Sequence, residues 1–148
     1  FFFLLIFWKY PRREAIYIAL ILIALIAFIL VITDLTKGFF ERLRPNNNAE
    51  ISSLIRVLKN PESFSFFSGH AASSFSITTF MVLFLRKKAK WCWVFYIWPL
   101  LFALSRIYVG VHYPIDILVG TIVGLLSAIA FYYLYKRLIV PYLGLVHP

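Results

Sequence analysis

Residues 14–33 read EAIYIALILIALIAFILVIT, a nearly uninterrupted apolar stretch. A helix rises about 1.5 Å per residue, so about 20 residues cross the roughly 30 Å hydrocarbon core of a bilayer. The stretch from Glu14 to Thr33 therefore predicts a membrane-spanning helix, and it is the clearest such prediction in the sequence.

The composition of the whole chain supports a membrane protein. Of its 148 residues, 62% are hydrophobic, 20% are aromatic and only 14% are charged. The mean hydropathy is +0.86, far outside the usual balance of soluble domains. A handful of spans of roughly 20 residues with short loops would use the entire length. We therefore expect a single integral-membrane domain over residues 1–148.

Further apolar segments extend the prediction to an all-α, polytopic transmembrane helical bundle. Candidate spans are Ala71–Leu85, Trp91–Tyr108 and Ile115–Tyr135, and the apolar Phe1–Trp8 resembles the end of an incomplete first span. The bundle would contain about five to six spans. Serine and threonine residues interrupt Ala71–Leu85, and small hydroxyl residues favour helix contact over lipid, so we expect this span inside the bundle.

Two mixed segments predict short interfacial helices. Leu35–Leu43 mixes apolar and charged residues, and Ile51–Leu58 has apolar residues at helical spacing with polar residues such as Arg56 between them. Both patterns indicate helices lying at the membrane surface, over the candidate site. Asn48 is a candidate cap for the second helix.

The distribution of charge predicts an orientation. If the spans alternate, one side carries nine basic residues and one acid: Lys9, Arg12, Arg13, Arg86, Lys87, Lys88, Lys90, Lys136, Arg137 and Glu14. The other side carries six basic and five acidic residues: Lys37, Arg42, Arg44, Arg56, Lys59, Arg106, Asp34, Glu41, Glu50, Glu62 and Asp116. The positive-inside rule places the first side in the cytoplasm. The second side would then face the exterior or, in a bacterium, the periplasm.

Other classes of protein fit poorly. The formal charge of +9 could indicate nucleic acid, but the basic residues stand at the ends of apolar segments and form no continuous stripe. The single cysteine, Cys92, can form neither an internal disulfide nor a metal cluster alone. No carboxylate cluster suited to Mg²⁺ is evident, so we expect no metal or other cofactor. No obligate protein partner is evident either.

The first polar block is Lys37, Glu41 and Arg44, spaced i, i+4 and i+7. On a helix these residues would share a face, with Glu41 able to brace both cations. An arginine fork and a lysine charge together suit phosphate oxygens. A surface helix attracted to anionic head groups is at least as good an interpretation of this block alone.

The second and third blocks stand at helix ends. Ser68 precedes the Ala71 span as a candidate N-cap, followed by Gly69 and His70, and free backbone N–H groups there suit an anion. His112 and Asp116 flank Pro114 at i, i+4, where a carboxylate can orient an imidazole as nucleophile. Structural alternatives exist for each, namely a capping serine and an acid favoured near a helix N-terminus.

Arg106 is a further candidate cation in the third block, although considered alone it could simply extend its guanidinium to water. All the blocks fall on the same predicted membrane face. Separate structural explanations would have to hold for every block at once, so jointly the pattern favours a functional site.

These residues resemble the three-part signature of the type-2 phosphatidic acid phosphatase superfamily. The matching elements are K-x6-R-P at 37–45, S-G-H at 68–70 and S-R-x5-H-x3-D at 105–116. Order, spacing and membrane setting agree, and the helical frame extends the likeness over nearly the whole chain. One departure is Phe67, where the family usually has proline.

The resemblance implies a metal-independent lipid phosphatase. It implies that His112 attacks phosphorus to form a phosphohistidine, that Asp116 orients it, and that His70 protonates the departing oxygen and later activates water. The phosphate ligands it implies are Lys37, Arg44, Ser68, Gly69 and Arg106.

The membrane setting indicates a lipid phosphate or pyrophosphate as substrate, with other membrane lipids around it. Undecaprenyl pyrophosphate or a related lipid such as phosphatidylglycerol phosphate is our first expectation, because an outward-facing phosphatase suits recycling of such a carrier in the cell envelope. Phosphatidic acid and lipid A phosphate also fit. Alternatives are a lipid phosphotransferase with the same site and, without catalysis, a lipid-binding scaffold or transporter. The expected location is the bacterial inner membrane.

Overall fold

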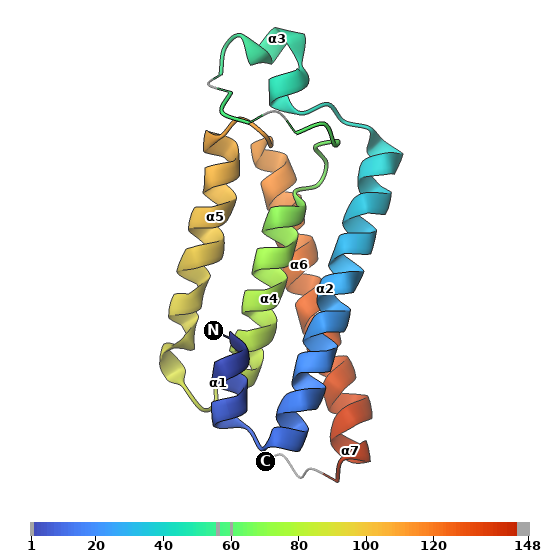
Figure 1. Ribbon diagram of the computed structural model, residues 1–148, viewed down its shortest axis with the longest axis vertical. Helices are drawn as coiled ribbons and strands as arrows, with labels where there is room; N and C mark the ends of the chain where they lie inside the picture. The colour runs from blue at the N-terminus through green and yellow to red at the C-terminus, as the bar shows by residue number, and fades with distance from the viewer. Residues whose placement is uncertain (1, 56, 60, 145–148) are drawn as a thin grey trace.

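The computed structural model describes residues 2–55, 57–59 and 61–144, and all the regular structure in this part of the chain is helical. The elements in order are α1 (Phe2–Lys9), α2 (Arg12–Phe40), η1 (Pro45–Asn47), α3 (Ala49–Ser52), α4 (Gly69–Leu85), η2 (Lys90–Tyr96), α5 (Ile97–Tyr108), α6 (Pro114–Leu134), η3 (Tyr135–Ile139) and α7 (Val140–Tyr142). Figure 1 shows α2, α4, α5 and α6 as a bundle of roughly parallel rods, with α3 and its loops above one end.

Among the described residues, α2, α5 with the preceding η2, and α6 are long and apolar enough to cross a membrane, and α4 is a shorter apolar helix. These elements correspond to the four complete spans expected from sequence. The eight-residue α1 lies at the position of the expected incomplete span. The prediction of an all-helical transmembrane bundle is therefore confirmed.

One face of α2 packs on the bundle and the others face outward. Its buried residues recur every three or four positions: Ala15, Ile18, Leu22, Leu25, Ile29 and Thr33. Large apolar residues between them, such as Leu20, Ile23 and Leu30, are exposed. In a bilayer these side chains would face lipid, so the helix needs only a narrow contact stripe.

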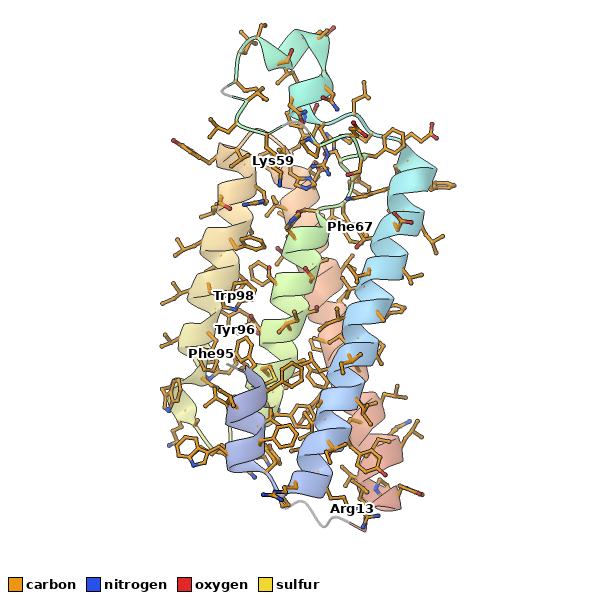
Figure 2. The ribbon with its side chains drawn as sticks, in the orientation of Figure 1. Arg13, Lys59, Phe67, Phe95, Tyr96 and Trp98 are labelled. Carbon is orange, nitrogen blue, oxygen red and sulfur yellow. The ribbon has the colours of Figure 1, made fainter. Side chains whose placement is uncertain are left out.

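α4 occupies the middle of the bundle, as its hydroxyl residues predict. It packs against α2, α5, η2 and most extensively α6, and most of its side chains are buried. Its buried hydroxyls have partners: Tyr96 donates to Thr79 (2.9 Å) and Trp98 to Thr78 (2.8 Å). Figure 2 shows Tyr96 and Trp98 between α5 and α4.

Two glycines allow α4 and α6 to approach closely. A Cβ added at Gly120 would lie 2.5 Å from the Ser68 carbonyl oxygen, and one at Gly124 would lie 2.4 Å from that of Ala72. Carbon atoms do not approach oxygen this closely, so these positions require glycine for the observed packing. In sequence, Gly120 and Gly124 form a small-xxx-small pair, a pattern that predicts such a tight helix contact. The structure confirms this prediction, and the contact fixes the start of α4 against α6.

The interfacial segments differ from the prediction. Leu35–Phe40 continues α2, which ends where Glu41 adopts a left-handed conformation (φ 44°). Only Ala49–Ser52 forms a helix in the second segment, with the Asn48 side chain accepting from Glu50 N–H (3.1 Å). Arg56 lies outside the described residues. Among the other described residues of these segments, Leu58 N–H donates to the Val109 carbonyl (3.4 Å), and the Arg42 carbonyl accepts from Ser65 N–H (2.8 Å). These bonds join the chain to distant residues at the end of the bundle.

Candidate active site

His112 and Asp116 meet where the chain turns from α5 into α6. Pro114 is the first residue of α6, as predicted, and the Asp116 carboxylate reaches back to accept from Tyr113 N–H (3.0 Å). Both side chains are buried, and His112 Nδ1 lies 3.6 Å from Asp116 Oδ2. This separation exceeds a hydrogen bond but places the carboxylate beside the imidazole.

Two further residues hold the Asp116 carboxylate. Arg42 Nη1 lies 3.0 Å from Oδ1, and the Ser65 hydroxyl donates to Oδ2. The Arg42 guanidinium also stacks on the Tyr113 ring, 4.1 Å from its centre. A fully buried carboxylate needs such partners to remain charged. Arg42 and Ser65 therefore fix both the charge and the orientation of the group beside His112.

Arg44 contacts the opposite side of the His112 ring. Its guanidinium donates through Nε to the Ser63 carbonyl (2.6 Å), through Nη2 to Ser63 Oγ (2.9 Å) and through Nη1 to the Val111 carbonyl (2.9 Å). Nη1 also lies 3.3 Å from His112 Nε2. The cation is thus buried in a cradle of loop atoms and directed at the imidazole.

These contacts define the tautomer of His112. A guanidinium has donors only, so Nε2 facing Arg44 is an acceptor and Nδ1 carries the proton directed toward Asp116. Burial lowers the pKa of His112 below its ordinary value; the Asp116 carboxylate opposes this shift, and Arg44 adds to it. The imidazole is therefore neutral at physiological pH, with its Nε2 lone pair on the side of the cation.

The Ser68-Gly69-His70 block begins α4 beside this pair. The Ser68 hydroxyl accepts from Ala71 N–H (3.4 Å), which confirms the predicted cap. Ser68 N–H donates to the Asp116 backbone carbonyl (3.0 Å), so the two motifs are joined through the main chain. The His70 and His112 rings lie 6.5 Å apart, centre to centre.

Lys37 and Arg106 approach from the neighbouring helices. A pocket of about 280 Å³ lies between α2 and α4 and is lined by Leu30, Thr33, Asp34, Lys37, Gly69, His70 and Ser73. Lys37 and His70 therefore border one cavity. Arg106 lies farther out: it donates to Ser105 Oγ (3.2 Å) and stacks on Phe102, whose ring also contacts His70.

The predicted helical face of Lys37, Glu41 and Arg44 is wrong. Lys37 is on α2, but the helix ends at Phe40 and Arg44 has an extended backbone (φ −74°, ψ 157°). The loop instead folds Arg44 inward to Ser63, Val111 and His112. The two cations approach the site from a helix and from a loop.

Sequence reasoning missed Arg42 and Ser65. A signal for Arg42 existed, because alternate residues of an extended segment point to the same side and Arg42 is two residues before Arg44. For Ser65 no such signal was available, since its partner Asp116 is 51 residues away in the chain.

The family of the chain follows from comparison with known proteins. Residues 15–139 match the family model described as the PAP2 superfamily. A lipid A 4'-phosphatase of Porphyromonas gingivalis is 30% identical over 142 residues, which are 89% of this chain and 58% of that protein. An undecaprenyl-diphosphatase of Sulfolobus acidocaldarius is 34% identical over 116 residues, 78% of this chain and 53% of that protein. The chain belongs to the PAP2 superfamily.

A solved structure agrees with the fold. The crystal structure of a transmembrane PAP2-type phosphatidylglycerolphosphate phosphatase from Bacillus subtilis superimposes with a TM-score of 0.68 at 24% identity, covering 90% of this chain and 64% of that one. The chain spans about half the length of the curated relatives it matches.

Proposed function

We propose that this chain carries the active site of a membrane lipid phosphatase that works through a phosphohistidine on His112. The observation that carries the proposal is the position of this imidazole between Asp116 on Nδ1 and Arg44 on Nε2. A neutral, oriented imidazole beside a buried cation suits attack on an anionic phosphoryl group.

In the first proposed step, His112 Nε2 forms a bond to phosphorus as the bond from phosphorus to the lipid oxygen breaks. His70, which takes up a proton as the anionic phosphate arrives, gives this proton to the departing oxygen. The His70 ring is exposed and lies 6.5 Å from the His112 ring, centre to centre, so both imidazoles are near enough to act on the same phosphoryl group. Asp116 stabilises the positive charge that develops on His112.

In the second proposed step, His70, now neutral, takes a proton from water, which attacks phosphorus and releases phosphate from His112. Lys37, Arg44 and Arg106 would neutralise the phosphoryl oxygens, and the Ser68 hydroxyl and Gly69 N–H would donate to them. Phosphoryl transfer depends largely on such positioning and charge, and these residues would supply both.

The first candidate substrate is undecaprenyl pyrophosphate or a related lipid phosphate. The similarity to a protein named undecaprenyl-diphosphatase supports it. The second candidate is a lipid A phosphate, favoured because two relatives named lipid A 4'-phosphatase are 30% and 34% identical to this chain. Release rates from both lipids and from phosphatidylglycerol phosphate, compared as kcat/KM, would separate the candidates.

We further propose the bacterial inner membrane as the location, with the site facing the periplasm. The positive-inside rule supports this orientation, since most of the basic residues stand at the start of α2, after α4 and after α6. Figure 1 shows this end of the bundle opposite the turn between α5 and α6, to which His112 belongs. An impermeant thiol reagent should label Asn47→Cys in intact cells. Labelling only after lysis would reverse the orientation.

The test of the mechanism is to trap the phosphorylated histidine. Wild-type protein quenched during turnover of a ³²P-labelled lipid should carry acid-labile label, and His112→Ala should carry none and release no phosphate while still binding lipid. His70→Ala is the matched control: it should slow both steps, and the label that it does acquire should still be on His112. Phosphate release by His112→Ala at the wild-type rate would refute the assignment. Label recovered in a second lipid would indicate phosphotransfer instead of hydrolysis.

A further inference from the structure

A second pocket lies at the end of the bundle opposite the candidate active site. It has a volume of about 220 Å³ and lies between the start of α2, the end of α4 and the junction of α6 with η3. Its lining consists of aromatic side chains and charged groups: Tyr10, Glu14, Leu83, Phe84, Lys87, Lys88, Tyr132, Tyr135 and Lys136. Figure 1 shows this end of the bundle beside α1 and α7.

Three lysines from two segments line this pocket, and aromatic rings position two of them. Lys88 Nζ lies 3.6 Å from the centre of the Tyr10 ring and donates to the Lys9 carbonyl (2.8 Å). Lys136 Nζ lies 5.4 Å from the centre of the Tyr132 ring. Cation–π contacts keep these ammonium groups at the pocket, although the lysine side chains are exposed.

The acidic group of the pocket lies inside. Glu14 is only 4% exposed, and the Tyr135 hydroxyl donates to its carboxylate (3.4 Å). The Tyr10 hydroxyl is directed elsewhere, to the Phe84 carbonyl (2.7 Å). Three ammonium groups against one carboxylate give the pocket a net positive charge. Because the lysines are exposed and Glu14 is buried, the charge that faces outward is positive.

We propose that this pocket binds the phosphate of an anionic lipid head group from the leaflet at this end of the bundle. The lysines supply the charge, and Leu83 and Phe84 supply apolar lining beside it. The volume is below the roughly 300–1,000 Å³ of pockets that enclose whole drug-sized ligands, so it suits a head group with its acyl chains outside. Basic pockets between helix ends bind anionic head groups in this manner.

This second site would bind lipid without turning it over. Both histidines of the described residues, His70 and His112, lie at the other end of the bundle, so the pocket has no nucleophile of that type. The inference is independent of the proposed phosphatase activity, and its test uses binding instead of catalysis.

The first experiment uses wild-type protein in nanodiscs of phosphatidylcholine with or without phosphatidylglycerol. Lysine acylation followed by mass spectrometry should show protection of Lys87, Lys88 and Lys136 by phosphatidylglycerol. Lys90, which is exposed at the same end and outside the pocket, is the internal control. Equal protection of Lys90 would overturn the proposal, because it would indicate general attraction to an anionic surface.

The second experiment compares two variants with the same loss of charge. Lys87→Gln/Lys88→Gln/Lys136→Gln should bind phosphatidylglycerol roughly tenfold to a hundredfold more weakly in native mass spectrometry, because three contacts to phosphate are lost. Arg12→Gln/Arg13→Gln/Lys90→Gln should bind as the wild type does. Equal weakening in both variants, or in neither, would overturn the site. Displacement of the lipid by millimolar inorganic phosphate would overturn the lipid assignment in favour of the free anion.

Discussion

Replacing Gly120 by alanine should disturb the candidate active site, because it would push apart α4 and α6, the helices that position the site. The added methyl group would lie 2.5 Å from the Ser68 carbonyl oxygen and 3.3 Å from Ala71 Cβ. Real Cβ contacts lie beyond 3.0 Å, so α4 and α6 must move apart by at least about 0.5 Å. Ser68 begins the helix that carries His70, and it also bonds to the Asp116 carbonyl. The displacement would therefore change the position of His70 relative to His112.

The expected magnitudes follow from this shift. Overpacking of a close contact typically costs about 1–3 kcal/mol of stability. A misplacement of about 1 Å can reduce a rate roughly 100-fold, so a shift of half that size should reduce kcat about tenfold. We expect Gly120→Ala to unfold at lower temperature and to release phosphate more slowly, with KM less affected than kcat.

Gly38→Ala is the matched control, because nothing lies within 4 Å of its added methyl group. It should retain wild-type activity and gain a little helix stability. Both variants are measured in the same nanodiscs, by phosphate release and by thermal unfolding. Wild-type activity in Gly120→Ala would refute the argument that the glycine contact sets the geometry of the site.

Three further predictions concern single contacts. Arg42→Gln should lower kcat about tenfold with little change in KM, and Arg42→Lys should restore part of the rate, because the residue positions the Asp116 carboxylate. The acidic limb of the kcat/KM profile should lie below pH 6.5, the ordinary pKa of histidine, because the proposed nucleophile His112 must be neutral and its pKa is lowered. Asp116→Asn removes the carboxylate that raises the pKa of His112 and should move that limb to still lower pH. Tyr96→Phe removes the donor to buried Thr79 and should cost about 1 kcal/mol in unfolding measurements without changing the rate.

Features of the fold that depend on neighbouring residues were predicted from sequence. The apolar stretch from Glu14 indicated α2, Ser68 indicated the start of α4 and Pro114 the start of α6, because span length, capping and a fixed φ are local properties. Gly120 and Gly124 indicated a close helix contact, which the structure places between α4 and α6.

Features that depend on distant partners were not predicted. The periodicity of Lys37, Glu41 and Arg44 suggested one helix, but the left-handed backbone at Glu41 ends it, and contacts to Ser63 and Val111 determine where Arg44 lies. Those partners are 19 and 67 residues away from Arg44 in the chain. Local spacing carries no information about these partners, so the sequence identified Arg44 as a candidate residue without predicting where its side chain lies.

The contact between Arg44 and His112 has a consequence for the order of events at this site. A guanidinium has five N–H groups, and four contacts of Arg44 already engage Ser63, Val111 and His112. The Arg44 Nη1–H group directed at His112 Nε2 occupies the lone pair that would attack phosphorus. An arriving phosphoryl group competes for this donor, and its negative charge makes it the stronger acceptor. Arrival of the anion would thereby uncover the nucleophile, so that the imidazole becomes reactive only when a phosphate is beside it.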